Sequence, residues 1–229
     1  MSRSTHRPAM AAGLRGLRAL SGKVAVAQMT SGGSQRANLE TVRALVAEAR
    51  RRDCRLLCLP EAFSFIGAAK EETRAAAQPL DGPLMAEYRS MAKEAALWLS
   101  LGGFQETGPD PDRVYNAHVF VTDEGELASV YRKVHLFDVD VPNGPVLQES
   151  SYTAPGGAVV VQDIPGLGRI GVTTCYDLRL VGERGGEKKQ QRDAETDTQL
   201  CVPDSPTSTS ISGSTWDATS CSCRARSRW

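Results

Sequence analysis

Residues 55–61, Arg-Leu-Leu-Cys-Leu-Pro-Glu, carry the clearest structural signal in this chain. Residues 56–59 are continuously apolar and Pro60 ends the run, which is typical of a strand that is covered on both faces. Upstream, residues 24–29 predict another short strand, and apolar residues recur at helical spacing over residues 39–49. A strand, a helix and a buried strand in this order indicate the start of an α/β arrangement.

Downstream of this segment the pattern changes from helical to hairpin spacing. Residues 84–95 predict a helix with Asp81 as its cap and Pro83 in its first turn, and residues 98–104 begin the next strand. Two hairpins are then expected, one of residues 114–121 with 126–131 and one of residues 159–164 with 169–174. Early helices and late hairpins predict a mixed sheet, so the expected fold class is α/β with α+β layering.

Both ends of the chain differ in composition from its middle. Residues 1–39 contain six Lys or Arg and no acidic residue, and we expect a basic, disordered leader over residues 1–22. A mitochondrial or plastid transit peptide is the alternative. Of the last 50 residues, 14 are Ser or Thr, which predicts a disordered polar tail over residues 181–229. One domain is therefore expected over residues 23–180.

The overall composition excludes several classes of protein. The 27 basic and 27 acidic side chains cancel, so the chain lacks the positive field that attracts phosphate backbones or anionic lipids. It also lacks an apolar run of the roughly 20 residues that span a bilayer. The six cysteines include no Cys-x-x-Cys pair, so no metal site is expected. We expect a cytoplasmic protein that acts on a small molecule and binds neither nucleic acid nor membrane.

Three polar residues follow the predicted strands, and together they suggest a reaction. Glu61, Lys133 and Cys175 each stand where a strand ends, and such side chains can meet at one edge of a sheet. A thiolate attacks carbonyl carbon, an ammonium lowers the pKa of the thiol and stabilises an oxyanion, and a carboxylate moves the proton. Taken singly, the same residues are typical of a helix cap, a surface lysine and a packed thiol. A hydrolase that pairs Cys175 with His118 or His135 is the alternative.

Three segments resemble the motif blocks of the carbon-nitrogen hydrolase (nitrilase) superfamily in the same order. They are residues 57–63 (LCLPEAF), 131–138 (YRKVHLFD) and 171–179 (GVTTCYDLR). The resemblance extends over residues 23–179. The segments 99–104 and 135–140 are similar to the branch of that family whose amidases act on deaminated glutathione.

The resemblance implies a fold and roles for particular residues. The fold would be part of an α-β-β-α sandwich. Glu61 would be the general base, Lys133 would bind the oxyanion and Cys175 would form a thioester with a small amide substrate. The backbone N–H of Tyr176 would be the second oxyanion donor, and Glu149 matches an additional glutamate near the triad. No metal or organic cofactor is implied.

After residue 179 the sequence departs from the family pattern. Family members continue with Phe-Pro-Glu and further strands and helices, whereas this chain continues with Leu-Val-Gly-Glu-Arg at 180–184 and then the polar tail. We therefore expect the domain to be incomplete and its activity to be impaired. The family-type homodimer is expected only for a complete protein. A non-catalytic isoform or remnant is the alternative.

Overall fold

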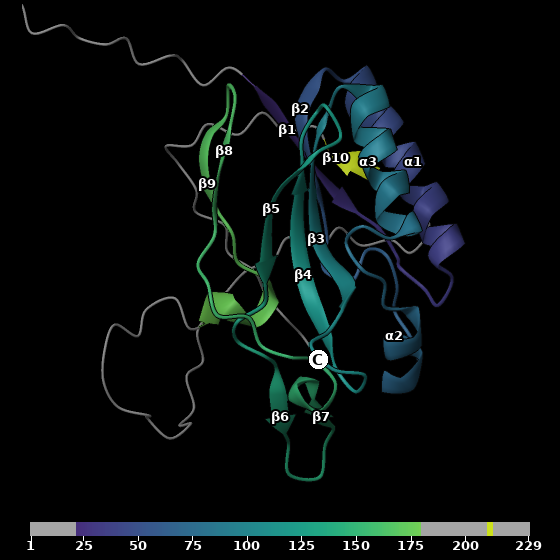
Figure 1. The fold of residues 1–229 in the computed structure, drawn as a ribbon, viewed down its shortest axis with the longest axis vertical. Helices are drawn as coiled ribbons and strands as arrows, with labels where there is room; N and C mark the ends of the chain where they lie inside the picture. Colours follow the sequence, from purple (N-terminus) through teal and green to yellow (C-terminus); the bar gives the residue numbers. More distant parts are fainter. Residues whose placement is uncertain (1–21, 180–209, 213–229) are drawn as a thin grey trace, which may run out of the picture.

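A mixed sheet of six strands is the centre of the fold (Figure 1). The computed structural model describes residues 22–179 and 210–212. The strand order is β10-β1-β2-β3-β4-β5. The strands are β1 (Lys23–Gln28), β2 (Cys54–Leu59), β3 (Trp98–Thr107), β4 (Val114–Val121), β5 (Leu127–Arg132) and β10 (Ser210–Ser212). Strands β1, β2 and β3 are parallel, whereas β4, β5 and β10 each pair antiparallel. The expected α/β class is confirmed.

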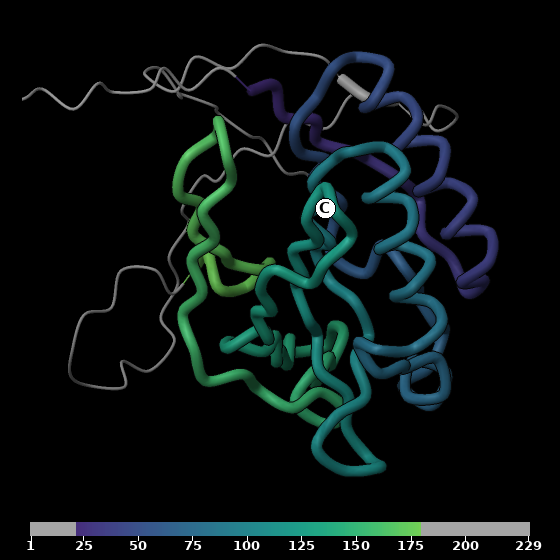
Figure 2. Tube along the Cα trace, turned by 45° about the horizontal axis from the view of Figure 1, so that its top comes forward, coloured from purple at the N-terminus to yellow at the C-terminus, as the bar shows by residue number. Residues whose placement is uncertain are grey.

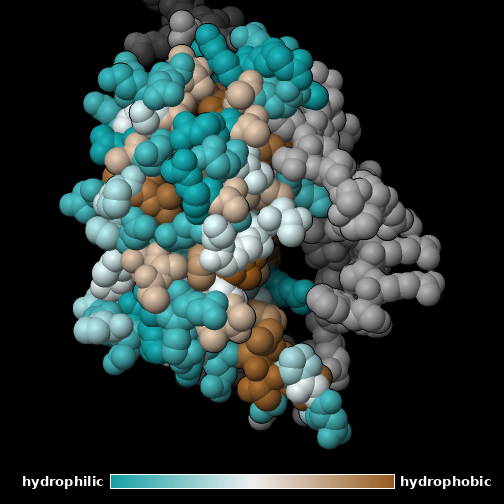
Figure 3. Space-filling model, turned by 90° about the vertical axis from the view of Figure 1, so that its right-hand side faces the viewer, coloured by the Kyte–Doolittle hydropathy of each residue, from teal (hydrophilic) through white to brown (hydrophobic). Residues whose placement is uncertain are grey.

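Helices α1 (Gln35–Arg51) and α3 (Pro83–Ala95) cover one face of this sheet. Helix α1 begins four residues before the predicted apolar face, because the Ser34 hydroxyl accepts a hydrogen bond from the Ala37 N–H. Its buried apolar residues, Leu39, Val42, Leu45, Val46 and Ala49, pack in one core with Leu57 and Leu59 of β2. Burial of each large apolar side chain contributes about 1.5–3 kcal/mol. The outward faces of the helices are largely hydrophilic (Figure 3).

The start of α3 differs from the prediction. Gly82, not Asp81, is the N-cap residue, and the Gln78 side chain accepts the Leu84 N–H of the first turn at 3.2 Å. The Gly82 N–H donates to the Pro79 carbonyl at 2.9 Å, so a turn before the helix places Gly82 at the cap position. A Cβ atom at Gly82 would lie 2.9 Å from that carbonyl oxygen, which explains the glycine. Pro83 occupies the first turn as expected.

The second predicted hairpin, β8 (Val161–Ile164) and β9 (Gly168–Gly171), lies on the other side of the sheet from the helices (Figure 2). Ile164 of β8 and Val172, the residue after β9, are buried in a second hydrophobic core. The main sheet supplies the rest of that core through Leu56, Trp98, Phe120 and Tyr131. The part of the chain that the structure describes therefore forms three layers, helices, sheet and hairpin, as expected for part of the sandwich.

Several short elements were not predicted from the sequence. They are α2 (Lys70–Ala76), β6 (Asp138–Asp140), β7 (Val146–Gln148) and the 3-10 turns η1 (Glu149–Ser151) and η2 (Cys175–Arg179). The β6–β7 hairpin projects from one end of the molecule (Figure 1). None of the described helices is long and apolar enough to cross a membrane.

The predicted leader and tail fall almost entirely outside the described residues. Of residues 1–22 the structure describes Gly22, and of residues 181–229 it describes Ser210–Ser212. These three residues form β10, which pairs with residues 26–28 of β1. Val24 and Val26 alternate along β1 with the buried Ala25 and Ala27, so they lie on the opposite face of the strand. They are 40% and 58% exposed, so the described residues leave this face of β1 partly uncovered.

Candidate active site

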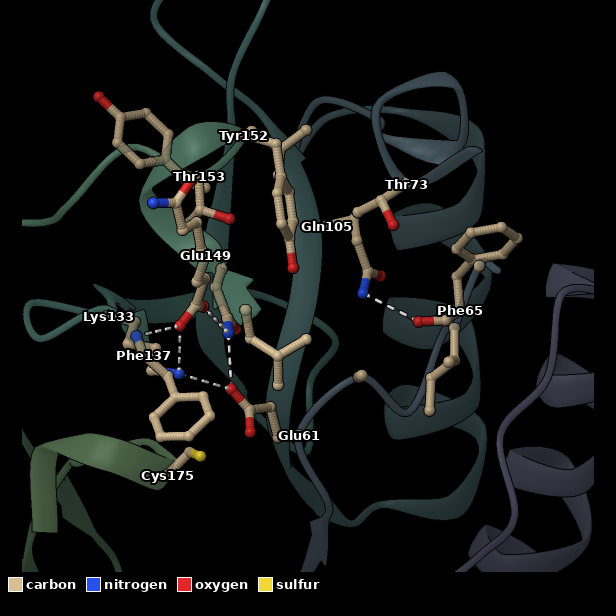
Figure 4. Close-up of a pocket in the computed structure, with 18 residues that line it drawn as sticks. Glu61, Phe65, Thr73, Gln105, Lys133, Phe137, Glu149, Tyr152, Thr153 and Cys175 are labelled. Carbon is tan, nitrogen blue, oxygen red and sulfur yellow. Dashed lines mark hydrogen bonds and ion pairs between the residues drawn. The ribbon is translucent and has the colours of Figure 1, made fainter. Parts of the chain in front are cut away.

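The side chains predicted to act together line one cavity of about 380 Å³ (Figure 4). Glu61 follows β2, Lys133 follows β5 and Cys175 is the first residue of η2. Glu149, the first residue of η1, lines the same cavity. The residues are far apart in sequence: the ends of β2 and β5 bring Glu61 and Lys133 together, and the turns η1 and η2 add Glu149 and Cys175.

Lys133 is the centre of the charged cluster. Its side chain is only 2% exposed, and its Nζ lies 3.1 Å from Glu61 Oε1 and 2.9 Å from Glu149 Oε2. Burial disfavours the ammonium, but the hydrogen bond to Glu149 and the two carboxylate charges outweigh that effect and raise the pKa of Lys133. Lys133 is therefore a fixed cation, and its backbone N–H is held by the Asn116 carbonyl at 2.9 Å.

Glu149 is held in place by more than its ion pair. Its Oε2 also accepts the Phe137 N–H at 2.7 Å, and its own N–H donates to the Phe137 carbonyl at 3.2 Å. The side chain is 12% exposed. These bonds fix the carboxylate beside Lys133, where it orients the ammonium.

Asn116 on β4 is a site residue that the sequence reasoning missed. Its Nδ2 donates to Glu61 Oε1 at 2.7 Å and faces Glu149 Oε1 at 3.4 Å, so one amide joins both carboxylates. The available signal was a polar residue within the mostly apolar segment 114–121. The adjacent β3 makes room for it, because a Cβ atom at Gly103 would lie 2.9 Å from Asn116 Oδ1 and 3.1 Å from Glu61 Cγ.

Cys175 adopts an unusual backbone conformation. Its φ is +51°, in the left-handed region that non-glycine residues rarely occupy. The predicted strand over residues 169–174 ends at Gly171, so Cys175 follows a short extended segment and begins a tight turn. Its sulfur points towards the side of the cavity that holds Glu61 (Figure 4).

The electrostatic environment of Cys175 corrects one expectation. The Lys133 ammonium does lower the pKa of the thiol, but burial, followed by the Glu61 carboxylate, raises it more. The net pKa is above the ordinary value. The resting residue is therefore a protonated thiol beside a carboxylate, and it needs a base before it can attack.

The contacts of Tyr176, His118 and His135 bear on which residue is the partner of the Cys175 thiol. The Tyr176 ring packs edge-to-face on Phe137, with 5.2 Å between the ring centroids. His118 Nε2 lies 2.7 Å from Ser100 Oγ, and burial lowers the pKa of His118 to about 4. His135 Nδ1 lies 2.9 Å from Asp177 Oδ1. Glu61 lines the same cavity as Cys175 and neither of these two histidines does, so the geometry favours Glu61 over a histidine as the partner of Cys175.

The opposite side of the cavity is neutral. Gln105 Nε2 donates to the Phe65 carbonyl at 3.0 Å, which fixes this amide in the wall. Thr73 and Tyr152 also line the cavity, and the Tyr152 hydroxyl is directed into it (Figure 4). Among the residues that the structure describes, no group of three or more His, Cys, Asp or Glu side chains is arranged to hold a metal ion. A small polar molecule with a carbonyl group fits the chemistry of this lining.

With this geometry in view, comparison with known proteins identifies the family. Residues 23–184 match the carbon-nitrogen hydrolase family. This chain belongs to that family. The deaminated glutathione amidase of Rattus norvegicus is 42% identical over 160 residues, which cover 69% of this chain and 49% of that protein. The nitrilase and fragile histidine triad fusion protein NitFhit of Drosophila melanogaster is 41% identical over 160 residues, or 70% of this chain and 34% of that protein.

Solved structures of carbon-nitrogen hydrolases agree with the fold. The crystal structure of the Caenorhabditis elegans NitFhit protein aligns with a TM-score of 0.63 at 34% identity, covering 69% of this chain and 39% of that chain. Saccharomyces cerevisiae Nit3, a member of branch 10 of the nitrilase superfamily, aligns with a TM-score of 0.56 at 28% identity, covering 69% and 58%. The chain spans about half the length of the deaminated glutathione amidases that it matches.

Proposed function

We propose that this carbon-nitrogen hydrolase chain carries the acid-base, oxyanion and nucleophile groups of an amidase. The observation that carries the proposal is the Lys133 ammonium, 3.1 Å from the Glu61 carboxylate in the cavity that Cys175 lines. This set supplies a nucleophile, a proton carrier and a cation for a developing oxyanion. The reaction is hydrolysis of a non-peptide carbon–nitrogen bond through a thioester on Cys175.

In the first half-reaction Glu61 accepts the Cys175 proton as the sulfur attacks the amide carbonyl carbon. The raised pKa of the thiol makes this transfer necessary, because little thiolate exists at neutral pH. The new C–S bond gives a tetrahedral intermediate. Its C–N bond then breaks, and Glu61 returns the proton to the nitrogen so that ammonia leaves. The acyl group remains on Cys175 as a thioester.

The tetrahedral oxyanion needs donors that are already in place. Lys133 supplies a fixed positive charge, because its pKa is raised and its ammonium is held by two carboxylates. The backbone N–H of Tyr176, next to the nucleophile, is the second donor in the proposal. Glu149 acts through Lys133, since it orients the ammonium and does not itself need to touch the substrate.

Water completes the cycle in the second half-reaction. Glu61 takes a proton from water, the resulting hydroxide adds to the thioester carbonyl, and the C–S bond breaks. The products are a carboxylic acid and the Cys175 thiol, which regains its proton from Glu61.

The proposed substrate is deaminated glutathione or a similar small ω-amide. The support is the 42% identity to relatives that are named deaminated glutathione amidase. The described cysteines Cys54, Cys58 and Cys175 are free thiols, which fits the reducing cytoplasm that we propose as the compartment. We propose lower activity for this chain than for those relatives. We propose the family-type homodimer only for a complete protein. The incompletely covered β1 face supports the first of these points.

Ammonia release from deaminated glutathione by the purified chain tests the function. We expect turnover that Cys175→Ala abolishes and that the matched variant Cys54→Ala retains, since Cys54 does not line the cavity. Mass spectrometry of a rapidly quenched reaction should show the acyl group on Cys175. A folded chain that releases no ammonia supports the alternative of a non-catalytic isoform, and turnover by Cys175→Ala overturns the nucleophile assignment.

A further inference from the structure

Asp177 is a buried carboxylate two residues after the nucleophile. Its side chain is 3% exposed, and four contacts satisfy it. Oδ2 accepts the Tyr131 hydroxyl at 2.6 Å and the Thr174 N–H at 2.9 Å. Oδ1 accepts the His135 N–H at 2.9 Å and lies 2.9 Å from His135 Nδ1. Burial alone would raise the pKa of Asp177, but these hydrogen bonds together lower it, so the carboxylate is charged.

The partners of Asp177 belong to two different parts of the site. Thr174 immediately precedes Cys175, whereas Tyr131 and His135 lie on either side of Lys133. The Tyr131 oxygen in turn accepts the Val134 N–H at 3.2 Å, so the backbone after Lys133 is also tied to this group. One carboxylate therefore joins the turn that carries the nucleophile to the turn that carries the oxyanion lysine.

The turn that carries Cys175 needs such an anchor. The φ of +51° at Cys175 is strained for a residue with a side chain and persists only where the surroundings hold it. Packing does little on the far side of the turn, because Leu178 is 66% exposed. Within the turn, the Asp177 N–H donates to the Thr174 carbonyl at 3.2 Å, so Asp177 closes the turn through its backbone as well as its side chain.

We propose that Asp177 is a positioning residue that holds the Cys175 thiol in register with Glu61 and Lys133. This inference rests on the proposed function, since it concerns the same site. Asp177 does not touch the substrate. Its effect on the reaction passes through the two turns that it joins. Loss of the Asp177 charge should therefore let the Cys175 thiol move away from the Glu61 carboxylate.

A double-mutant cycle on Cys175 reactivity tests the proposal without any amide substrate. The second-order rate of iodoacetamide labelling at Cys175 is measured by peptide mass mapping in the parent chain, Glu61→Gln, Asp177→Asn and the double variant. Iodoacetamide reacts with the thiolate that is already present, so this reaction, unlike amide hydrolysis, does not need Glu61 as a base. In the parent, Glu61→Gln should therefore speed labelling by about threefold or more, because the carboxylate raises the pKa of the thiol it faces and so lowers the thiolate fraction. In the Asp177→Asn background the same change should alter the rate by less than about 1.5-fold.

Two further variants separate positioning from general stability. Asp163→Asn removes a carboxylate that is 71% exposed on β8, and it should leave the Glu61 effect at the parent value. Tyr131→Phe removes one bond to Asp177 and should reduce the Glu61 effect without abolishing it. If Asp177→Asn does not fold, as judged by its thermal unfolding, Tyr131→Phe carries the test.

The outcomes distinguish the two proposals. A Glu61 effect of threefold that persists unchanged in Asp177→Asn, or in Tyr131→Phe where that variant carries the test, overturns the positioning role alone. This holds even if the unfolding midpoint falls, because a purely structural residue would lower stability and leave the coupling intact. A parent chain without any Glu61 effect overturns the pairing of Glu61 with Cys175, and both proposals fail together.

Discussion

Replacement of Lys133 by methionine is the most informative single change at this site. Methionine fills a similar volume but removes the cation that lies between Glu61 and Glu149. Near 4 Å, an ion pair at an effective dielectric constant of about 20 is worth about 4 kcal/mol before desolvation is counted. Removing one partner of a buried pair costs about 3–5 kcal/mol net. Because Glu61 is 32% exposed and can be solvated, we expect the lower end, about 3 kcal/mol.

This loss should be visible in the thermal unfolding of the chain. For a domain of this size, about 3 kcal/mol corresponds to a fall in Tm of about 6–12 °C. Ammonia release should fall by about 10²–10³-fold, the usual effect of removing an oxyanion donor. Lys93→Met on the exposed face of α3 is the matched control and should change neither quantity. A Tm for Lys133→Met equal to that of Lys93→Met would refute the reasoning.

The pH dependence of the same difference is a further check on the lysine. The folded-state pKa of Lys133 is raised above its ordinary value, so its contribution to stability is fully present below the unfolded-state pKa. The contribution is lost only as the pH rises through the folded-state pKa. The difference in unfolding free energy between parent and Lys133→Met should therefore stay constant from about pH 6 to pH 9. A difference that vanishes by pH 8 would contradict a fixed cation.

Three other predictions concern the groups around the nucleophile. Asn116→Leu removes the donor that lies 2.7 Å from Glu61 Oε1. We expect ammonia release to fall about tenfold and the free energy of unfolding to fall by about 1.5–3 kcal/mol. Unchanged kinetics would count against the role of Asn116. Iodoacetamide at neutral pH should label Cys175 faster than Cys58, because burial raises the pKa of Cys58 to about 11. Faster labelling of Cys58 in the folded chain would show that the site is assigned wrongly. Gly103→Ala places a Cβ atom 2.9 Å from Asn116 Oδ1 and 3.1 Å from Glu61 Cγ, so we expect a lower Tm and slower turnover. A variant that matches the parent in both quantities would refute the tight fit.

The sequence alone predicted those features that depend on neighbouring residues. The apolar run at residues 56–59 gave β2, helical spacing gave α1, and the turn residues at 122–125 and 165–168 gave both hairpins. Each is a local pattern of periodicity and turn chemistry. The ends of strands, and thus the positions of Glu61 and Lys133 at one edge of the sheet, follow from the same patterns.

Contacts between distant residues were decided by the tertiary structure. Asn116 lies 55 positions from Glu61, and Lys133 lies 72 positions from it, so strand register alone sets whether their atoms meet. Packing of the β8–β9 hairpin against the main sheet brings Asp177 to Tyr131, 46 positions away. No local pattern of polarity contains this information.

The remaining differences have the same physical origin. The sequence showed that a lysine could lower the pKa of Cys175, but the balance of that charge against burial and Glu61 depends on the distances in the folded cavity. Likewise, the turn before α3 moved its cap from Asp81 to Gly82. The residue types and their order determined which reactive groups this chain carries. The packing of the sheet decided which groups face the thiol, because electrostatic effects and hydrogen bonds depend on separations of a few ångströms in space.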